Sequence, residues 1–387
     1  MQPTARLNTD YEQRICVIES QGSFIHEILN IPLIENAVNT HDKVSLIGSQ
    51  DFIVNTFSIM SEYCNKIPLG KIICFPLEPP KRLWSLSQLK FELQALSLCG
   101  DVKEILLLSV SPFTSIAVVL DSLRRKLRRR NFSTISAVYH GYLANLLPRK
   151  KRPDPYLYRK GFRIFIHPFR YILQPKFTLP LSKTKFGRIN YLVLSSHILQ
   201  NLIDSCHKYD NFKLMKLEIM KFDTGRLEIK ENGKINVLII GRSPSSELNL
   251  LLEMLRFQEG LRVKLYVDKR VERHIFIENR QFLEFVNLEN RLTIVEVSRK
   301  AHILLMLRNT DESDFRLSGA MLEAISLSRP ILLPEWIRKV KIDNKFNFPS
   351  EFYSSTPQLA GILSDHNRLI QLVSENSALT HSKEVSR

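Results

Sequence analysis

The sequence predicts an α/β protein built from two Rossmann-like domains that face a cleft. Short runs rich in Val and Ile alternate with longer helical patterns along the chain. Near-continuous apolar strands separated by helices are typical of a parallel sheet covered on both faces. The alternation fades after residue 205 and begins again at residue 235. The 387 residues are enough for two domains, because a domain commonly holds about 100–200 residues.

The first half of the chain contains six strand-like runs separated by helical or irregular segments. They are RICVI (14–18), VSLI (44–47), KIICF (71–75), EILLLSV (104–110), STISAVY (133–139) and INYLVL (189–194). The last run leads into SSHILQNLIDS, where Ser195 or Ser196 is a suitable N-cap for a helix. We expect the first domain to cover residues 1–205.

The second half repeats the pattern with different content. The predicted strands are 235–240, 262–267, 292–297, 302–307 and 330–333, and the predicted helices are 246–257, 319–326, 356–364 and 367–375. We expect the second domain to cover residues 206–387, including the C-terminal helices.

The excess positive charge is confined to one segment. The chain carries a formal charge of +16 at pH 7, and residues 121–190 hold 18 Lys and Arg against only Asp121 and Asp154. Six prolines within residues 148–180 predict an irregular excursion there. The candidate membrane-docking residues are Arg124, Arg125, Lys126, Arg128, Arg129, Arg130, Arg149, Lys150, Lys151 and Arg152.

Three interpretations of this basic segment remain open. Anionic lipid headgroups attract basic residues with about 1 kcal/mol each, nucleic acid phosphates would also attract them, and a solvated basic face needs no partner. No helix-turn-helix, zinc finger or RNA-recognition motif accompanies the charge, so we favour an anionic membrane surface over nucleic acid.

Several classes of protein are disfavoured because the sequence lacks the motifs that are typical of them. The five cysteines never form a CxxC spacing, which argues against a disulfide scaffold or a structural zinc site and favours a reducing compartment. No run of 18 apolar residues and no signal-peptide core occurs, so we expect a cytoplasmic protein. Neither GxGxxG nor GxxxxGK[ST] is present, which disfavours dinucleotide and P-loop sites. We expect no metal and no cofactor.

Candidate site residues follow the strands, because open α/β sheets bind ligands outside the carboxyl ends of their strands. In the first domain these residues are Gly22, His26 and Asn30, which we expect to line the acceptor side of the cleft, and His140. In the second domain they are Arg242, Ser318, Gly319 and Glu323. The helix that opens at Ser318-Gly319 offers exposed N–H groups and a dipole that suit an anionic phosphate.

Four segments together resemble GT-B glycosyltransferases, particularly glycosyltransferase family four. RLSGAMLEAISLSRPILLPE (316–335) is similar to the donor-site motif of that family, and IIGR (239–242) is similar to the strand and Arg that open its donor domain. AVYHG (137–141) and LVLSSHILQNLID (192–204) resemble first-domain segments of the family, so the likeness extends over most of the chain.

The resemblance implies a hexosyltransferase with a nucleotide-sugar donor, metal-independent and retaining. Arg242 would clamp the diphosphate, Ser318 and Gly319 would donate N–H groups to it, Glu323 would bind the ribose, and His140 would contact the transferred sugar. The acceptor would be a saccharide or a lipid-linked molecule for polysaccharide or glycolipid biosynthesis, presented at the cytosolic face of the membrane to a peripheral protein.

Departures from the family pattern leave two alternatives open. The family has a second Glu where this chain has Phe315, and it has a Lys shortly after the Arg of IIGR, which is absent from residues 243–248. These differences put the retaining mechanism in doubt. They also allow a non-catalytic GT-B scaffold or partner subunit, with nucleic-acid binding as a third, weaker alternative.

Overall fold

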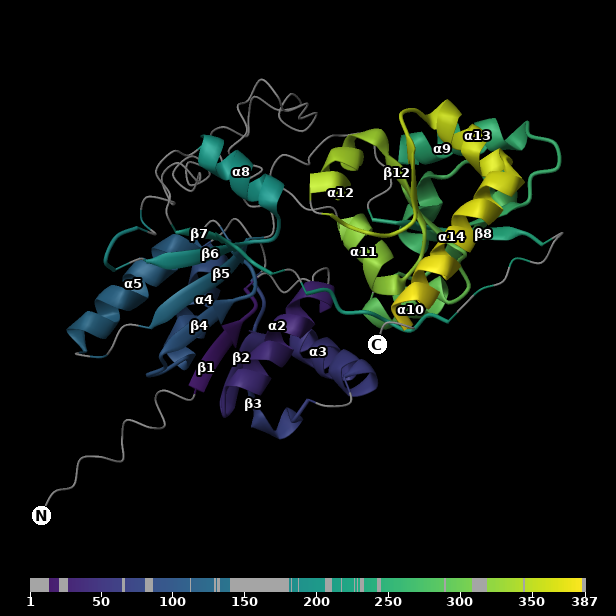
Figure 1. Ribbon diagram of the computed structural model, residues 1–387. Coiled ribbons are helices and arrows are strands. Elements are labelled where there is room, and N and C mark those ends of the chain that lie inside the picture. The colour runs from purple at the N-terminus through teal and green to yellow at the C-terminus, as the bar shows by residue number, and fades with distance from the viewer. Residues whose placement is uncertain are drawn as a thin grey trace, which may run out of the picture. The chain divides into compact units, whose positions relative to one another are not determined.

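The computed structural model divides the chain into two compact units. It describes residues 14–20, 27–64, 67–80, 86–111, 113–128, 130, 133–139, 181, 183–186, 188–205, 211–216, 218–225, 227, 229, 233–241, 245–288, 290–307, 319–343 and 345–384. Among these residues, the first unit ends at Glu218 and the second begins at Ile219. Each unit is a parallel sheet with helices packed against it, as the sequence predicts (Figure 1).

The first unit contains a seven-stranded sheet in the order β3-β2-β1-β4-β5-β6-β7. Its strands are β1 (Arg14–Ile18), β2 (Lys43–Ser49), β3 (Ile72–Leu77), β4 (Glu104–Leu107), β5 (Thr134–Tyr139), β6 (Ile189–Val193) and β7 (Phe212–Leu214). Its helices are α2 (Glu27–Thr40), α3 (Gln50–Tyr63), α4 (Leu86–Leu98), α5 (Thr114–Leu127), α8 (Ser196–Ser205) and a short 3₁₀ helix at Leu69–Lys71. Successive strands are added on one side of β1 up to β3 and on its other side from β4 onward. The topological switch point therefore lies between β1 and β4.

The first unit extends past residue 205 because β7 joins its sheet. Phe212 pairs with Tyr191 in the parallel register of β7 on β6. The rings of Tyr191 and Phe212 stack with their centroids 5.1 Å apart, and Tyr139 meets Tyr191 edge-on at 5.3 Å. Aromatic pairs of this kind add to the stabilisation from burial alone. The domain boundary therefore falls after β7 rather than directly after α8.

The second unit contains a six-stranded sheet in the order β10-β9-β8-β11-β12-β13. Its strands are β8 (Ile235–Ile240), β9 (Val263–Asp268), β10 (Leu283–Val286), β11 (Ile303–Met306), β12 (Ile331–Pro334) and β13 (Ser350–Tyr353). Its helices are α9 (Ser245–Arg256), α10 (Arg291–Ser298), α11 (Gly319–Leu327), α12 (Arg338–Asp343), α13 (Thr356–Ser364) and α14 (His366–Glu384), with 3₁₀ helices at Lys269–His274, Ile277–Phe282 and Glu335–Ile337. Here the switch point lies between β8 and β11.

One predicted strand of the second unit is wrong. Residues 292–297, expected as a strand, form helix α10. The side chain of Asn290 accepts a hydrogen bond from the backbone N–H of Thr293 at 2.9 Å, which caps the first turn of the helix. A short apolar run cannot be assigned to strand or helix by its periodicity alone, and here the Asn290 cap favours the helix.

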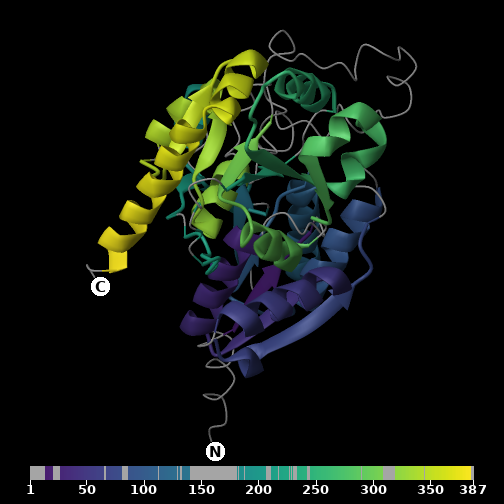
Figure 2. The ribbon, with the colours of Figure 1, turned by 90° about the vertical axis from the view of Figure 1, so that its right-hand side faces the viewer.

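The C-terminal helices complete the core of the second unit. Leu359, Ile362 and Leu363 of α13 and Leu369 and Leu372 of α14 are buried in the same cluster as the strands. Figure 2 shows α14, in yellow, running along the outside of this unit. Of the helices that the structure describes, none combines the length and the apolar character needed to cross a bilayer.

Candidate functional site

The carboxyl edge of the second sheet holds the predicted site residue Gly319 and also Gly241, which directly precedes the predicted Arg242. Gly241 directly follows β8, and Gly319 opens α11, which precedes β12. Gly241 has φ +79°, a backbone conformation that strains any residue with a Cβ. Gly319 is exposed, and a Cβ added there would meet no atom within 4 Å. Its own surroundings therefore do not require glycine at residue 319, and a ligand could approach this helix end closely.

Glu323 lies one turn into α11 and is held by an arginine that the sequence analysis missed. The guanidinium of Arg291, at the start of α10, forms an ion pair with Oε2 of Glu323. The Arg291 side chain is 2% exposed and the Glu323 side chain 15% exposed. The Glu323 carboxylate is thus fixed in place and still reaches the surface, as a group that accepts hydrogen bonds from a ligand must be.

The first unit holds a buried polar cluster at its own switch point. Glu19 follows β1, and its Oε1 accepts a hydrogen bond from Ser109, which follows β4, at 2.5 Å. The predicted site residue Asn30 is 1% exposed and donates to Oε2 of Glu19 at 3.2 Å. Gln88 of α4 donates to the backbone oxygen of Ser20 at 2.9 Å. Asn30 therefore lies with the groups that converge at the carboxyl ends of β1 and β4.

Glu92 extends this cluster and has a strongly shifted pKa. The Gln88 amide also donates to Oε1 of Glu92 at 2.8 Å. Burial raises the pKa of Glu92 to about 7, against the opposing hydrogen bonds of Ser111, Gln88 and Thr114 to its charged form. Near neutral pH this side chain can hold or release a proton inside the first unit.

The stability of the first unit is expected to depend on pH through Glu92. Because its pKa is raised from 4.5 to about 7, the folded chain holds a proton in this window that the unfolded chain has lost. The free energy of unfolding therefore falls as the pH rises from about 4.5 to 7, by about 3 kcal/mol in total. A Glu92→Gln variant has no titrating carboxyl at this position, so its free energy of unfolding should not fall in this way. Its stability relative to the wild type should therefore increase as the pH rises across the same window.

Urea unfolding of both proteins between pH 4.5 and 8 measures this difference. The exposed Glu62→Gln on α3 is the matched control and should differ from the wild type by less than about 0.5 kcal/mol throughout. Parallel stability curves for Glu92→Gln and the wild type would show that Glu92 does not titrate in this window.

A separate cavity of about 470 Å³ lies away from both carboxyl edges. It is lined by Leu33, Thr40 and His41 of α2 and its C-terminal end, and by Glu104 and Thr134 at the amino ends of β4 and β5. Ligands of open parallel sheets bind at the opposite ends of the strands, so we do not assign this cavity to the candidate site.

Comparison with known proteins identifies the architecture. No family model and no curated protein matches the chain. A solved glycosyltransferase from Rickettsia africae superposes with a TM-score of 0.55 and 12% identity, covering 94% of this chain and 92% of that one. A putative UDP-N-acetylglucosamine 2-epimerase from Listeria monocytogenes gives 0.53 and 10%, covering 94% and 91%. Phytolacca americana UGT2, solved with UDP-2-fluoro-glucose and pterostilbene, gives 0.52 and 12%, covering 95% and 94%.

The chain has a GT-B-like fold. Both units are shared with these proteins over almost their full length, which shows the fold but, at such low identity, not the family or the substrate. Membership of glycosyltransferase family four stays a prediction.

Many of the predicted site residues fall outside the described residues of this GT-B-like fold. They are Gly22, His26, His140, Arg129, Arg149, Lys150, Lys151, Arg152, Arg242 and Ser318. Of the predicted donor-binding set, the structure describes Gly319 and Glu323, both on α11.

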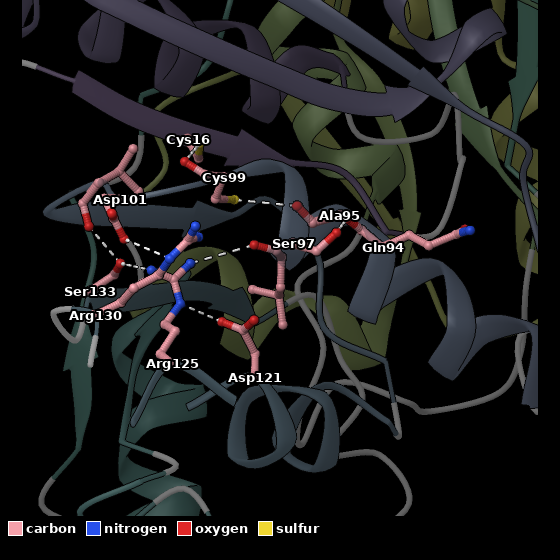
Figure 3. A network of polar contacts seen from close by, with 12 residues as sticks. Cys16, Gln94, Ala95, Ser97, Cys99, Asp101, Asp121, Arg125, Arg130 and Ser133 are labelled. Atoms are coloured by element: carbon pink, nitrogen blue, oxygen red, sulfur yellow. Dashed lines mark hydrogen bonds and ion pairs between the residues drawn. The ribbon is translucent and has the colours of Figure 1, made fainter. Parts of the chain in front are cut away.

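One residue of the predicted membrane-docking set is wrongly placed on the surface. Arg125 is 6% exposed, and its Nε donates to Oδ2 of Asp121 at 2.6 Å (Figure 3). It also donates to Oγ of Ser133 at 3.3 Å and to the backbone oxygen of Leu96 at 3.5 Å. Arg125 therefore holds α5 against its neighbours in the GT-B-like fold, because position 125 lies on the inner face of the helix.

The rest of the described docking set is exposed. Arg124, Lys126, Arg128 and Arg130 all reach solvent. The Lys126 ammonium lies 4.8 Å from the centre of the Phe186 ring, and Arg130 lies 3.8 Å from a carboxylate oxygen of the exposed Asp101. These contacts leave an accessible cationic surface.

Proposed function

We propose that this chain is a glycosyltransferase that moves a hexose from a nucleotide-sugar donor to a saccharide or lipid-linked acceptor. The reaction would serve polysaccharide or glycolipid biosynthesis at the cytosolic face of the membrane. The observation that carries the proposal is the carboxyl edge of the second sheet, where Gly241 and the exposed start of α11 flank the switch point and Glu323 is held one turn further on. The GT-B-like fold of the solved glycosyltransferases supports it.

The proposed chemistry needs a group that stabilises a departing nucleotide diphosphate. The N–H groups at the start of α11 and the guanidinium of Arg242 would donate hydrogen bonds to the phosphate oxygens, and Glu323 would bind the ribose hydroxyls. His140 would contact the transferred sugar while the bond between its anomeric carbon and the diphosphate breaks. The acceptor hydroxyl would attack this oxocarbenium-like carbon and give its proton to the departing diphosphate. Such a site works without a metal ion, and retention of the anomeric configuration is part of the proposal.

A screen of nucleotide sugars by thermal shift tests the donor class. UDP, GDP, ADP and CMP sugars are added to the full chain, and the correct donor at 100 times its Kd stabilises the protein by about 2.7 kcal/mol. Product analysis with the stabilising donor then separates the reactions. Release of the nucleotide with transfer to an acceptor supports the proposal, whereas alteration of the sugar without an acceptor would match the 2-epimerases instead.

Replacement of Glu323 by glutamine is expected to weaken donor binding. Gln keeps the shape but loses the charge that strengthens hydrogen bonds from the ribose diol, so the Kd for the nucleotide should rise about tenfold. Calorimetric titration of the folded variant measures the change. Glu296→Gln on the exposed face of α10 is the control and should leave the Kd unaltered. An unchanged Kd for Glu323→Gln would remove Glu323 from the proposed site.

A non-catalytic GT-B subunit is the second candidate, and a specific observation favours it. The Arg291 ion pair already uses one oxygen of Glu323, and Phe315 stands where the resembled family has a second Glu. A chain of this kind would show no thermal shift with any of the nucleotide sugars and no turnover.

A further inference from the structure

The outward face of α5 carries leucines where a sheet-covering helix normally carries polar residues. Leu120 is 43% exposed, Leu123 41% and Leu127 86%. Their spacing of three and four residues places them on one stripe of the helix. The opposite stripe, which includes Val118, is buried against the first unit. The three leucines thus form the solvent-facing apolar stripe of an amphipathic helix, and among the residues that the structure describes they remain exposed.

Positive side chains flank this leucine stripe on both sides. Arg124 and Arg128 lie one turn apart along one border, and Lys126 lies along the other. The contact between Lys126 and the Phe186 ring brings a second basic segment beside the helix, with Lys183, Lys185 and Arg188 exposed. Within residues 122–203 the only acidic residue is Asp154. The surface around the leucines is therefore cationic.

We propose that the outer face of α5 docks on an anionic lipid bilayer, with Leu120, Leu123 and Leu127 entering the boundary between headgroups and acyl chains. The flanking cations bind lipid phosphates, as in other interfacial helices with leucine on one stripe and Lys or Arg beside it. The purpose of docking rests on the proposed function, because it would bring the chain to a lipid-linked acceptor. The binding itself requires no donor and no catalysis.

The other partners fit the surface less well. A nucleic acid would neutralise the cations but would leave the exposed leucines without apolar contact. A second copy of this chain would bring an equally positive surface against the first, and like charges repel. An anionic bilayer can bury the apolar stripe among its acyl chains and bind the flanking cations through its phosphates.

Vesicle flotation of the full chain tests the proposal with matched variants. The vesicles consist of phosphatidylcholine with or without phosphatidylglycerol, at low and high salt. The wild type should float with the anionic vesicles, and part of this binding should persist at high salt because the apolar contact is not screened. The combined variant Leu120→Gln, Leu123→Gln, Leu127→Gln should partition at least about tenfold less.

Two further variants assign the effect to this helix. Arg124→Gln with Arg128→Gln should remove most of the preference for phosphatidylglycerol while keeping the weak binding to neutral vesicles. Leu250→Gln with Phe257→Gln changes apolar residues that are 43% and 81% exposed on the second unit, and it should bind vesicles like the wild type. All the replaced side chains are exposed, and circular dichroism is used to check that each variant is folded.

Two outcomes would overturn the proposal. One is flotation of the leucine variant equal to that of the wild type. The other is a dimeric wild type together with a monomeric leucine variant, as measured by size-exclusion chromatography with light scattering. That result would show that the leucine stripe is a contact between two copies of the chain. Nucleotide-sugar thermal shifts measured on the same variants keep the tests separate, because donor binding and vesicle binding can each fail while the other persists.

Discussion

Replacement of Arg329 by methionine is expected to destabilise the second unit by about 3–5 kcal/mol. Arg329 is 5% exposed and donates to three backbone oxygens. These are Ser298 at the end of α10, at 3.2 Å, and Thr224 and Gly225 in the segment that leads into the unit, at 2.9 and 2.8 Å. Burial lowers the pKa of Arg329 only to about 10, so the guanidinium stays charged at neutral pH. Methionine fills the space but leaves all three oxygens without these donors.

Urea unfolding followed by circular dichroism measures this loss, with separate transitions for the two units analysed individually. Arg338→Met is the control, since the Arg338 side chain is 51% exposed in its ion pair with Glu335 and should contribute less than about 1 kcal/mol. Equal stability of the Arg329 and Arg338 variants would contradict the anchoring role of Arg329.

Replacement of Asp121 by asparagine is expected to cost about 3–5 kcal/mol in the first unit. The Asp121 and Arg125 side chains are each 7% exposed, and the substitution leaves the buried Arg125 charge without its counter-ion (Figure 3). Removal of both charges, with Asp121→Leu and Arg125→Leu, should be much less damaging than the single change, because no buried charge is left unpaired.

A double-mutant cycle over Asp121→Asn, Arg125→Leu and their combination measures the coupling between the two side chains. We expect a coupling energy of at least about 1.5 kcal/mol. Additive losses would mean that the two groups do not stabilise each other, in contradiction to their contact in the structure.

The strands could be predicted because buried parallel strands have a strong local signature. The runs at 14–18 and 235–240 match β1 and β8 residue for residue. The short strands β7, β10 and β13 have no such signature, since their pairing depends on neighbours distant in the chain. Residues 292–297 show the limit of apolar patterns, because Asn290, the cap that makes them helical, lies outside the run.

The candidate site could be predicted only where a residue directly follows a strand or opens a helix. Gly319 opens α11, and Glu323 lies one turn further along the same helix; their roles in donor binding stay predictions. Arg291 and the buried polar cluster at Glu19 depend on contacts between residues far apart in sequence, which no spacing reveals. For Arg125 a local signal existed, because Asp121 lies four residues earlier on the same helical face. A run of cations shows total charge but not which members face inward.

In the proposed function, the carboxyl edge of the second sheet binds the diphosphate of a nucleotide sugar. Hydrogen exchange of the full chain, with and without the donor selected by thermal shift, tests this most directly. Bound donor should slow the exchange of the amides at the start of α11, from Gly319 to Glu323, and of the turn at Gly241 after β8. Donor binding that leaves the exchange of both segments unchanged would contradict it.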